Sequence, residues 1–209
     1  MIMDIRMLQE DLKLMPERDF FMKHIVKSQN WYISEYLKVP VERLIDHLDT
    51  LKEIVSKNFK IGFHSLQIVG SAKTGFSLSP IKIFTPFHDA SDKIPASDID
   101  IALVSDRLYH YWWGEIRKNT RIYYPENQFL LEALSKSVFK GFINEKDICK
   151  LPEFRIAWHK IADSTNRDLQ DSLGFVHPIS YRIYRSWEDL EEYQLYSIKK
   201  AKKQQERGK

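Results

Sequence analysis

Two short stretches decide the fold of this chain: Leu66-Gln67-Ile68-Val69-Gly70-Ser71 and Ser97-Asp98-Ile99-Asp100-Ile101-Ala102-Leu103-Val104. In the first, an apolar run stops at a glycine, which predicts a short buried strand followed by a turn. The second predicts a strand that carries two carboxylates. Because side chains alternate between the faces of a strand, Asp98 and Asp100 would point to the same side of the sheet.

Two carboxylates on one face of an apolar strand are costly unless something positive lies between them. Like charges at this spacing repel each other and disfavour the ionised forms. A hard divalent cation, which prefers oxygen ligands, removes that repulsion. The spacing of Asp98 and Asp100 therefore predicts a site for Mg²⁺ or Mn²⁺. The alternative is a pair of carboxylates on an edge strand that face solvent.

The two stretches, in this order and each on an apolar strand, resemble the nucleotidyltransferase superfamily with the polymerase-beta-like fold. The resemblance covers residues 60–105. It implies that the Gly70-Ser71 pair opens a helix and contacts the phosphates of a nucleotide. It also implies that Asp98 and Asp100 are catalytic and hold the metal. Lys73, just beyond the turn, would add positive charge for the phosphates.

Two features differ from the family pattern. Ser71 and Asp98 are 27 positions apart, which is longer than usual. A third carboxylate, which the family commonly carries on a later strand, has no clear counterpart. The extra length forms the stretch 76–96, which contains three prolines and is expected to be a long loop. Because it lies between the two halves of the predicted site, we expect a lid or a substrate-selecting loop.

The composition is that of an ordinary globular protein. Of the 209 residues, 43% are hydrophobic and 29% are charged, and the formal net charge is +3. The single cysteine, Cys149, excludes an internal disulfide framework and a cysteine-based zinc site. No apolar run approaches the roughly 20 residues that span a bilayer. Acidic residues within the first fifteen positions would interrupt the apolar core of a signal peptide, so none is expected there. We therefore expect a cytoplasmic protein that does not bind membranes.

The remaining patterns predict an α/β (α+β) fold with a small mixed sheet and flanking helices. Residues 1–60 are expected to form a helical segment packed on the core, and residues 61–198 a nucleotidyltransferase-like domain. The tail 199–209 is rich in charge and is expected to be flexible. Within the domain, 125–146 is predicted as helix, with Gly141 as a candidate helix end, and 175–185 is predicted as a strand. Helices are also expected to start at Pro152 and, after an N-capping Ser186, at Trp187. Ser105 and Asp106, after the aspartate strand, are expected to form a turn or a helix cap.

The resemblance implies an enzyme that moves a nucleoside monophosphate from a nucleoside triphosphate to a hydroxyl group, releasing pyrophosphate. The acceptor would be a protein side chain, a nucleic acid or another nucleotide, and the sequence does not distinguish these. The missing third carboxylate keeps a second hypothesis open. Under this second hypothesis the chain is a catalytically weak or inactive nucleotide-binding module that has a regulatory role and acts with a partner protein.

A third hypothesis is a DNA-binding regulator. Residues 33–37 would form the first helix of a helix-turn-helix, 38–40 the turn, and the following segment the second helix. The turn lacks a glycine, and the second helix carries Glu42, Asp46, Asp49 and Glu53, which would face phosphates poorly. A packed pair of helices is the alternative for this segment.

Overall fold

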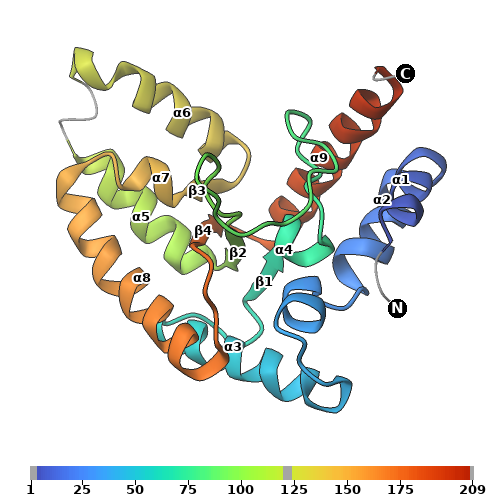
Figure 1. The fold of residues 1–209 in the computed structure, drawn as a ribbon. Coiled ribbons are helices and arrows are strands. Elements are labelled where there is room, and N and C mark those ends of the chain that lie inside the picture. The colour runs from blue at the N-terminus through green and yellow to red at the C-terminus, as the bar shows by residue number, and fades with distance from the viewer. Residues whose placement is uncertain (1–3, 120–123, 208–209) are drawn as a thin grey trace.

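The structure is a computed structural model that describes residues 4–119 and 124–207 (Figure 1). The strands are β1 (Leu66–Val69), β2 (Ile99–Val104), β3 (Phe142–Asn144) and β4 (Ile179–Tyr184). The N-terminal part contains α1 (Ile5–Leu14), α2 (Glu17–Phe21), the π-helices η1 (Met22–Val26) and η2 (Tyr32–Tyr36), the 3₁₀ turn η3 (Val41–Arg43), and α3 (Leu44–Phe59). The later helices are α4 (Ser71–Thr74), α5 (Asp106–Lys118), η5 (Pro125–Asn127), α6 (Gln128–Phe139), α7 (Glu145–Ile148), α8 (Pro152–Leu173) and α9 (Trp187–Arg207).

The four strands form one mixed sheet in the order β1-β2-β4-β3. β1 runs antiparallel to β2, β2 runs parallel to β4, and β4 runs antiparallel to β3. Helices α5 to α8 fill the long connection between β2 and the parallel strand β4, which such a pair requires. The predicted α/β fold with a small mixed sheet is confirmed.

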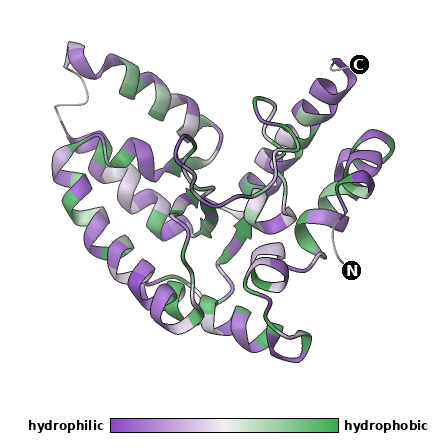
Figure 2. Ribbon diagram, viewed as in Figure 1, coloured by the Kyte–Doolittle hydropathy of each residue, from purple (hydrophilic) through white to green (hydrophobic). Residues whose placement is uncertain are grey.

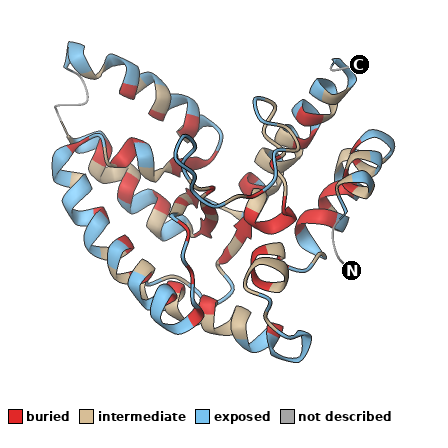
Figure 3. Cartoon of the chain, in the orientation of Figure 1, coloured by how far each residue is buried: buried red, intermediate tan, exposed pale blue. Residues whose placement is uncertain are grey.

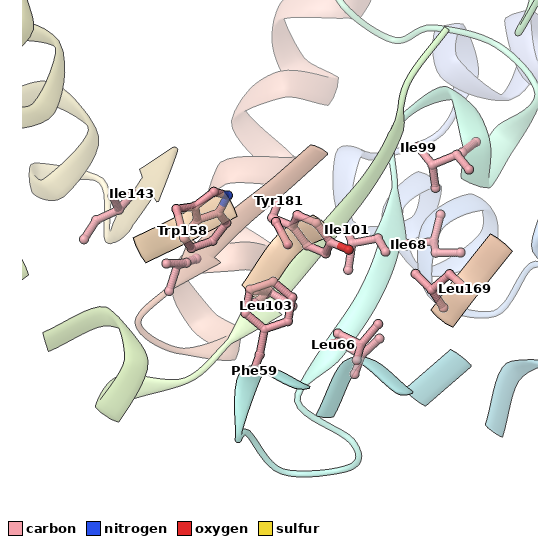
Figure 4. Packing of buried hydrophobic residues seen from close by; sticks show 14 of the residues in the cluster. Phe59, Leu66, Ile68, Ile99, Ile101, Leu103, Ile143, Trp158, Leu169 and Tyr181 are labelled. Carbon is pink, nitrogen blue, oxygen red and sulfur yellow. The ribbon is translucent and has the colours of Figure 1, made fainter. Parts of the chain in front are cut away.

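One face of the sheet packs on α3, α5 and α8 and forms the main core (Figure 4). Figure 4 shows Phe59, Trp158 and Leu169 from the helices beside side chains of the strands, among them Ile101 and Tyr181. The other face is smaller and packs Val104 and Tyr184 against Leu190 of α9. The strands are mostly buried, and the outer side of α8 is exposed (Figure 3).

The N-terminal helices lie beside the C-terminal helix. Leu8 and Leu12 of α1 and Phe20 of α2 form a second cluster with Ile198 and Ala201 of α9 (Figure 1). Hydrophobic and hydrophilic residues alternate in short runs along α9, as expected for a helix with one buried stripe (Figure 2). In the described part of the chain, no helix is both long enough and apolar enough to cross a bilayer.

Three expectations from the sequence need correction. β3 lies inside the segment 125–146, which was predicted as helix; Gly141, at φ +75°, ends α6 and turns the chain into the strand. The predicted strand 175–185 is shorter, because pairing begins at Ile179. The tail expected to be flexible from 199 is helical as far as Arg207, because one side of it packs on α1. The two last residues lie outside the described ranges.

Other local predictions are confirmed. Pro152 starts α8, and Ser105 and Ser186 each accept a backbone N–H near the start of the helix that follows. Ile33, the first residue of the predicted helix-turn-helix, and Tyr32 just before it are fully buried in the main core. Most of the predicted first helix lies in the π-helix η2, which packs into the protein, and the DNA-binding hypothesis stays a prediction without structural support.

Candidate functional site

The site is built around a turn between β1 and α4. β1 ends at Val69, Gly70 adopts φ +68° and ψ −153°, and Ser71 begins the helix. This backbone conformation is accessible to glycine and strained for other residues. A second glycine, Gly75 at φ +79°, ends α4 after a single turn. The predicted strand, glycine turn and short helix are therefore all present.

Both aspartates lie next to this turn. Asp98 immediately precedes β2, and Asp100 is the second residue of the strand. Both line one cavity of about 330 Å³, together with Gly70 and Ser71. The structure thus brings together four of the five residues that the sequence predicted for the site.

The surroundings of Asp100 shift the pKa of its carboxyl. Burial raises its pKa above the ordinary value, and the negative charge of Asp98 raises it further. A hydrogen bond from Ser180 and the charges of Arg182 and Lys146 act in the opposite direction. Asp98 is partly exposed and has Nζ of Lys146 at 3.7 Å from its Oδ2. The carboxylate pair is therefore only partly neutralised by the protein itself.

Strand β4 supplies groups that the sequence did not predict. Ser180 pairs with Asp100 in the parallel register, and its Oγ donates a hydrogen bond of 2.8 Å to Oδ1 of Asp100. Arg182 lies two residues further, on the same face of the sheet. Both residues line the cavity.

The side chain of Arg182 is fixed from several sides. Its Nε donates a hydrogen bond of 2.7 Å to Oδ1 of Asn144 on β3, and one terminal nitrogen donates to the hydroxyl of Tyr184 at 3.3 Å. The guanidinium lies 4.7 Å from the ring centre of Tyr193 and 5.0 Å from that of Phe142. A cation held in this way is preorganised for a phosphate or carboxylate oxygen.

Lys73 is the predicted site residue that the structure does not bring to this cavity. Its side chain is buried, and its Nζ donates a hydrogen bond of 2.6 Å to the backbone oxygen of Ser28. Burial lowers its pKa to about 8. The lysine lines a different cavity, so its predicted contact with phosphates in the site of Gly70 and Ser71 needs correction.

The long loop forms one wall of the cavity. Ser77, Leu78, Ser79, Pro80 and Lys82 line it. The start of the loop is a narrow turn, in which Ser77 N–H donates to the Thr85 oxygen at 2.9 Å and Phe84 N–H donates to the Ser77 oxygen at 2.7 Å. The loop is therefore structured where it meets the site, and Lys82 brings a third cation to the cavity.

Further along, the loop is attached to the body of the protein. Oδ1 of Asp89 accepts a hydrogen bond of 2.6 Å from the Tyr36 hydroxyl and lies 3.1 Å from Nε2 of His177. His177 closely precedes β4, which carries Ser180 and Arg182. The loop is therefore held against the segment that leads into β4. A lid function of the loop stays a prediction.

None of the family models, curated proteins or solved structures compared with this chain matches it. Any functional conclusion therefore rests on the geometry of the cavity.

The oxygen atoms that line the cavity are of the kind that hard divalent cations bind. Asp98 and Asp100 offer carboxylate oxygens and Ser180 offers a hydroxyl, and Mg²⁺ or Mn²⁺ would relieve the repulsion within the pair. In residues 4–119 and 124–207, no three or more His, Cys, Asp or Glu side chains form a group that could hold a metal ion. A metal bound here would thus need ligands from a substrate or from water, as Mg²⁺ commonly has.

Proposed function

We propose that this chain is a metal-dependent nucleotidyltransferase that moves a nucleoside monophosphate from a nucleoside triphosphate to a hydroxyl acceptor. One observation carries the proposal: a pair of carboxylates and a fixed arginine line the same cavity as the glycine turn. Carboxylates suit a metal ion, and the cations suit phosphate oxygens. A site for a metal-bound polyphosphate needs both.

Each residue has a role in this proposal. Asp98 and Asp100 would hold Mg²⁺, which when bound neutralises charge on the phosphates. Arg182 and the more exposed Lys146 would bind phosphate oxygens, and the Ser71 hydroxyl would donate to another. Positioning and charge stabilisation would then supply most of the rate enhancement.

The reaction would be an in-line displacement at the α-phosphorus. The acceptor oxygen forms a bond to phosphorus while the bond from phosphorus to the bridging oxygen breaks, and pyrophosphate leaves with that bonding pair. The proton of the acceptor hydroxyl passes to a carboxylate.

Ser180 favours a second candidate function. The strand beside Asp100 carries a hydroxyl at the paired position, where a third carboxylate would complete a group of three. With only Asp98 and Asp100 placed to hold a metal together, the chain would bind a nucleotide and Mg²⁺ but transfer slowly or not at all. It would then serve as a regulatory module, with a partner protein completing the site.

The first test is calorimetric titration with each of the four ribonucleoside triphosphates and Mg²⁺. We expect binding by the wild type and its loss in Asp98→Ala/Asp100→Ala. Asp92→Ala, an exposed position in the loop, is the matched control and should bind normally. Absence of binding by a well-folded wild type would contradict both candidate functions.

A transfer assay then separates the two candidates. Nucleoside triphosphates labelled at the α-phosphate would be incubated with protein, nucleic acid and nucleotide acceptors. Label transferred by the wild type and not by the double variant supports the enzyme. Binding with no transfer to any acceptor supports the regulatory module.

A further inference from the structure

A second cavity, of about 540 Å³, lies on the other side of α4 from the candidate site. α2, η1, α3, β1 and α9 contribute to its walls. Most of the surface is apolar, with contributions from Phe21, Met22, Val26, Leu48, Leu51 and Ile68. A cavity of this size, with mainly apolar walls and few polar groups, is typical of small-molecule sites.

The enclosed charged group in this cavity is Lys73. The residue is 6% exposed, and its Nζ donates to the Ser28 oxygen at 2.6 Å. In the part of the chain that the structure describes, no carboxylate lies within ion-pair distance of it. Burying an ammonium group without a counter-charge is costly. A ligand with a negative group would supply the missing partner.

The segment that carries Ser28 is unusual in its backbone. It lies between η1 and η2, and both are π-helices. π-Helices are rare and occur frequently at functional sites. Asn30, in the same segment, also lines the cavity and is buried, and its Oδ1 has no hydrogen-bond partner among the described residues. The polar end of the cavity therefore has an unused acceptor on Asn30, whereas the ammonium of Lys73 has donors left for the carboxylate of a ligand.

The other charges at the cavity already have partners. Lys52 donates to Asp49 at 2.9 Å, and Glu191 pairs with Arg18. The ion pairs of Lys52 and Glu191 are exposed or half-buried, whereas the side chain of Lys73 is buried. The geometry thus favours an anionic head group at Lys73 and an apolar body along the remaining walls.

We propose that this cavity binds a small carboxylate with an apolar body, with its carboxylate on Lys73 and its body between α2, η1 and α3. This ligand is distinct from the nucleotide of the candidate site, so the two proposals stand or fail separately.

The first experiment compares three probes that share one hydrocarbon chain. Octanoate, octanol and octylamine are titrated into the full-length wild type by calorimetry. We expect octanoate to bind at least about tenfold more tightly than octanol, because a charged hydrogen bond is added. Octylamine should bind most weakly. No binding of octanoate, or equal binding of octanoate and octylamine, would overturn the proposal.

Two lysine variants then locate the head group. Lys73→Met should lose the preference for octanoate over octanol while still binding octanol. Lys52→Met removes a cation from the same cavity and should keep the preference. If Lys52→Met loses it and Lys73→Met does not, the carboxylate lies at the rim and the assignment to Lys73 is wrong.

A steric variant keeps the test decisive if Lys73→Met does not fold. Leu48→Trp adds volume from the α3 side of the cavity and leaves Lys73 intact. Circular dichroism would establish that each variant is folded. In folded Leu48→Trp, both octanoate and octanol should bind at least about tenfold more weakly. Unchanged octanoate binding in this variant would show that the ligand lies elsewhere and would overturn the proposal.

Discussion

A Cβ atom placed on Gly70 would lie 2.4 Å from Oδ2 of Asp100. The backbone of the turn and the half-buried carboxylate are thus in direct contact, and only a residue without a side chain fits between them. This contact joins the two stretches that the sequence singles out.

We expect Gly70→Ala to destabilise the protein by about 3 kcal/mol or more. The substitution combines the strain of a positive φ with overlap against Asp100. Gly174→Ala is the control for a positive φ without overlap, because Gly174 has φ +70° and ψ +27° and no heavy atom within 4 Å of its would-be Cβ. The control should cost only about 1–2 kcal/mol, which is the strain of the left-handed conformation. Urea denaturation measures both, and equal losses would show that the contact with Asp100 is unimportant.

We expect Ser180→Asp to make stability depend on divalent metal. A third carboxylate beside Asp100 adds repulsion, so without metal the variant should be less stable than Ser180→Asn by about 1–3 kcal/mol. Mn²⁺ that binds the folded state should recover this loss. Thermal unfolding with chelator and with Mn²⁺ tests the expectation. If Mn²⁺ stabilises Ser180→Asn as much as Ser180→Asp, the cation does not bind at this position.

We expect stability to fall as the pH rises through the titration of Glu145. Burial raises the pKa of this carboxyl from 4.5 to about 7, and hydrogen bonds from Trp158 and the Tyr181 backbone oppose that effect only in part. Because the folded state holds the proton more tightly than the unfolded chain does, the stabilisation is present below about pH 4.5. It is lost progressively up to about pH 7, and the full loss is about 3 kcal/mol.

The matched variants are Glu145→Gln and Glu126→Gln. Denaturation midpoints between about pH 5 and about pH 8 should fall less in Glu145→Gln than in the wild type. Glu126 is exposed, so its substitution should leave the pH profile unchanged. Identical profiles for all three proteins would contradict the assignment to Glu145.

We expect the C-terminal end of α9 to contribute to stability. Ala201 is fully buried against α1, Lys202 donates to the Met15 oxygen at 2.9 Å, and Gln205 donates to the Gln9 oxygen at 3.0 Å. Ala201→Asp should therefore cost about 3 kcal/mol, because it buries a charge without a partner. Lys203→Asp, at an exposed position, should change stability by less than about 0.5 kcal/mol. Hydrogen exchange in α1 should rise in the first variant only.

Local signals in the sequence predicted the parts of the site that depend on neighbouring residues. The alternation of Asp98 and Asp100, the glycine turn and the serine caps of α5 and α9 are properties of a few consecutive positions. Arg182 was missed because its place at the cavity depends on which strand lies beside β2. That neighbour comes from far along the chain, and the sequence alone did not predict the order of the strands.

Two errors in the sequence predictions, the position of Lys73 and the missed strand β3, have simple physical causes. Successive residues of a helix are about 100° apart, so Ser71 and Lys73 are separated by about 200° and project to opposite sides of α4. The sequence placed both beside the phosphates. β3 was missed because Phe142, Ile143 and Asn144 are too few to show a period of two after a helical pattern.

The hydrogen bond between Ser180 and Asp100 joins residues that are 80 positions apart. A growing chain could pair β1 with β2 as soon as both have left the ribosome, but β4 follows only after α5 to α8. Closing so long a loop carries an entropic cost before the pairing can compensate for it. The cavity is thus expected to be among the last parts of the protein to form during synthesis, and a nascent chain that stops before β4 would have its aspartates but no completed site.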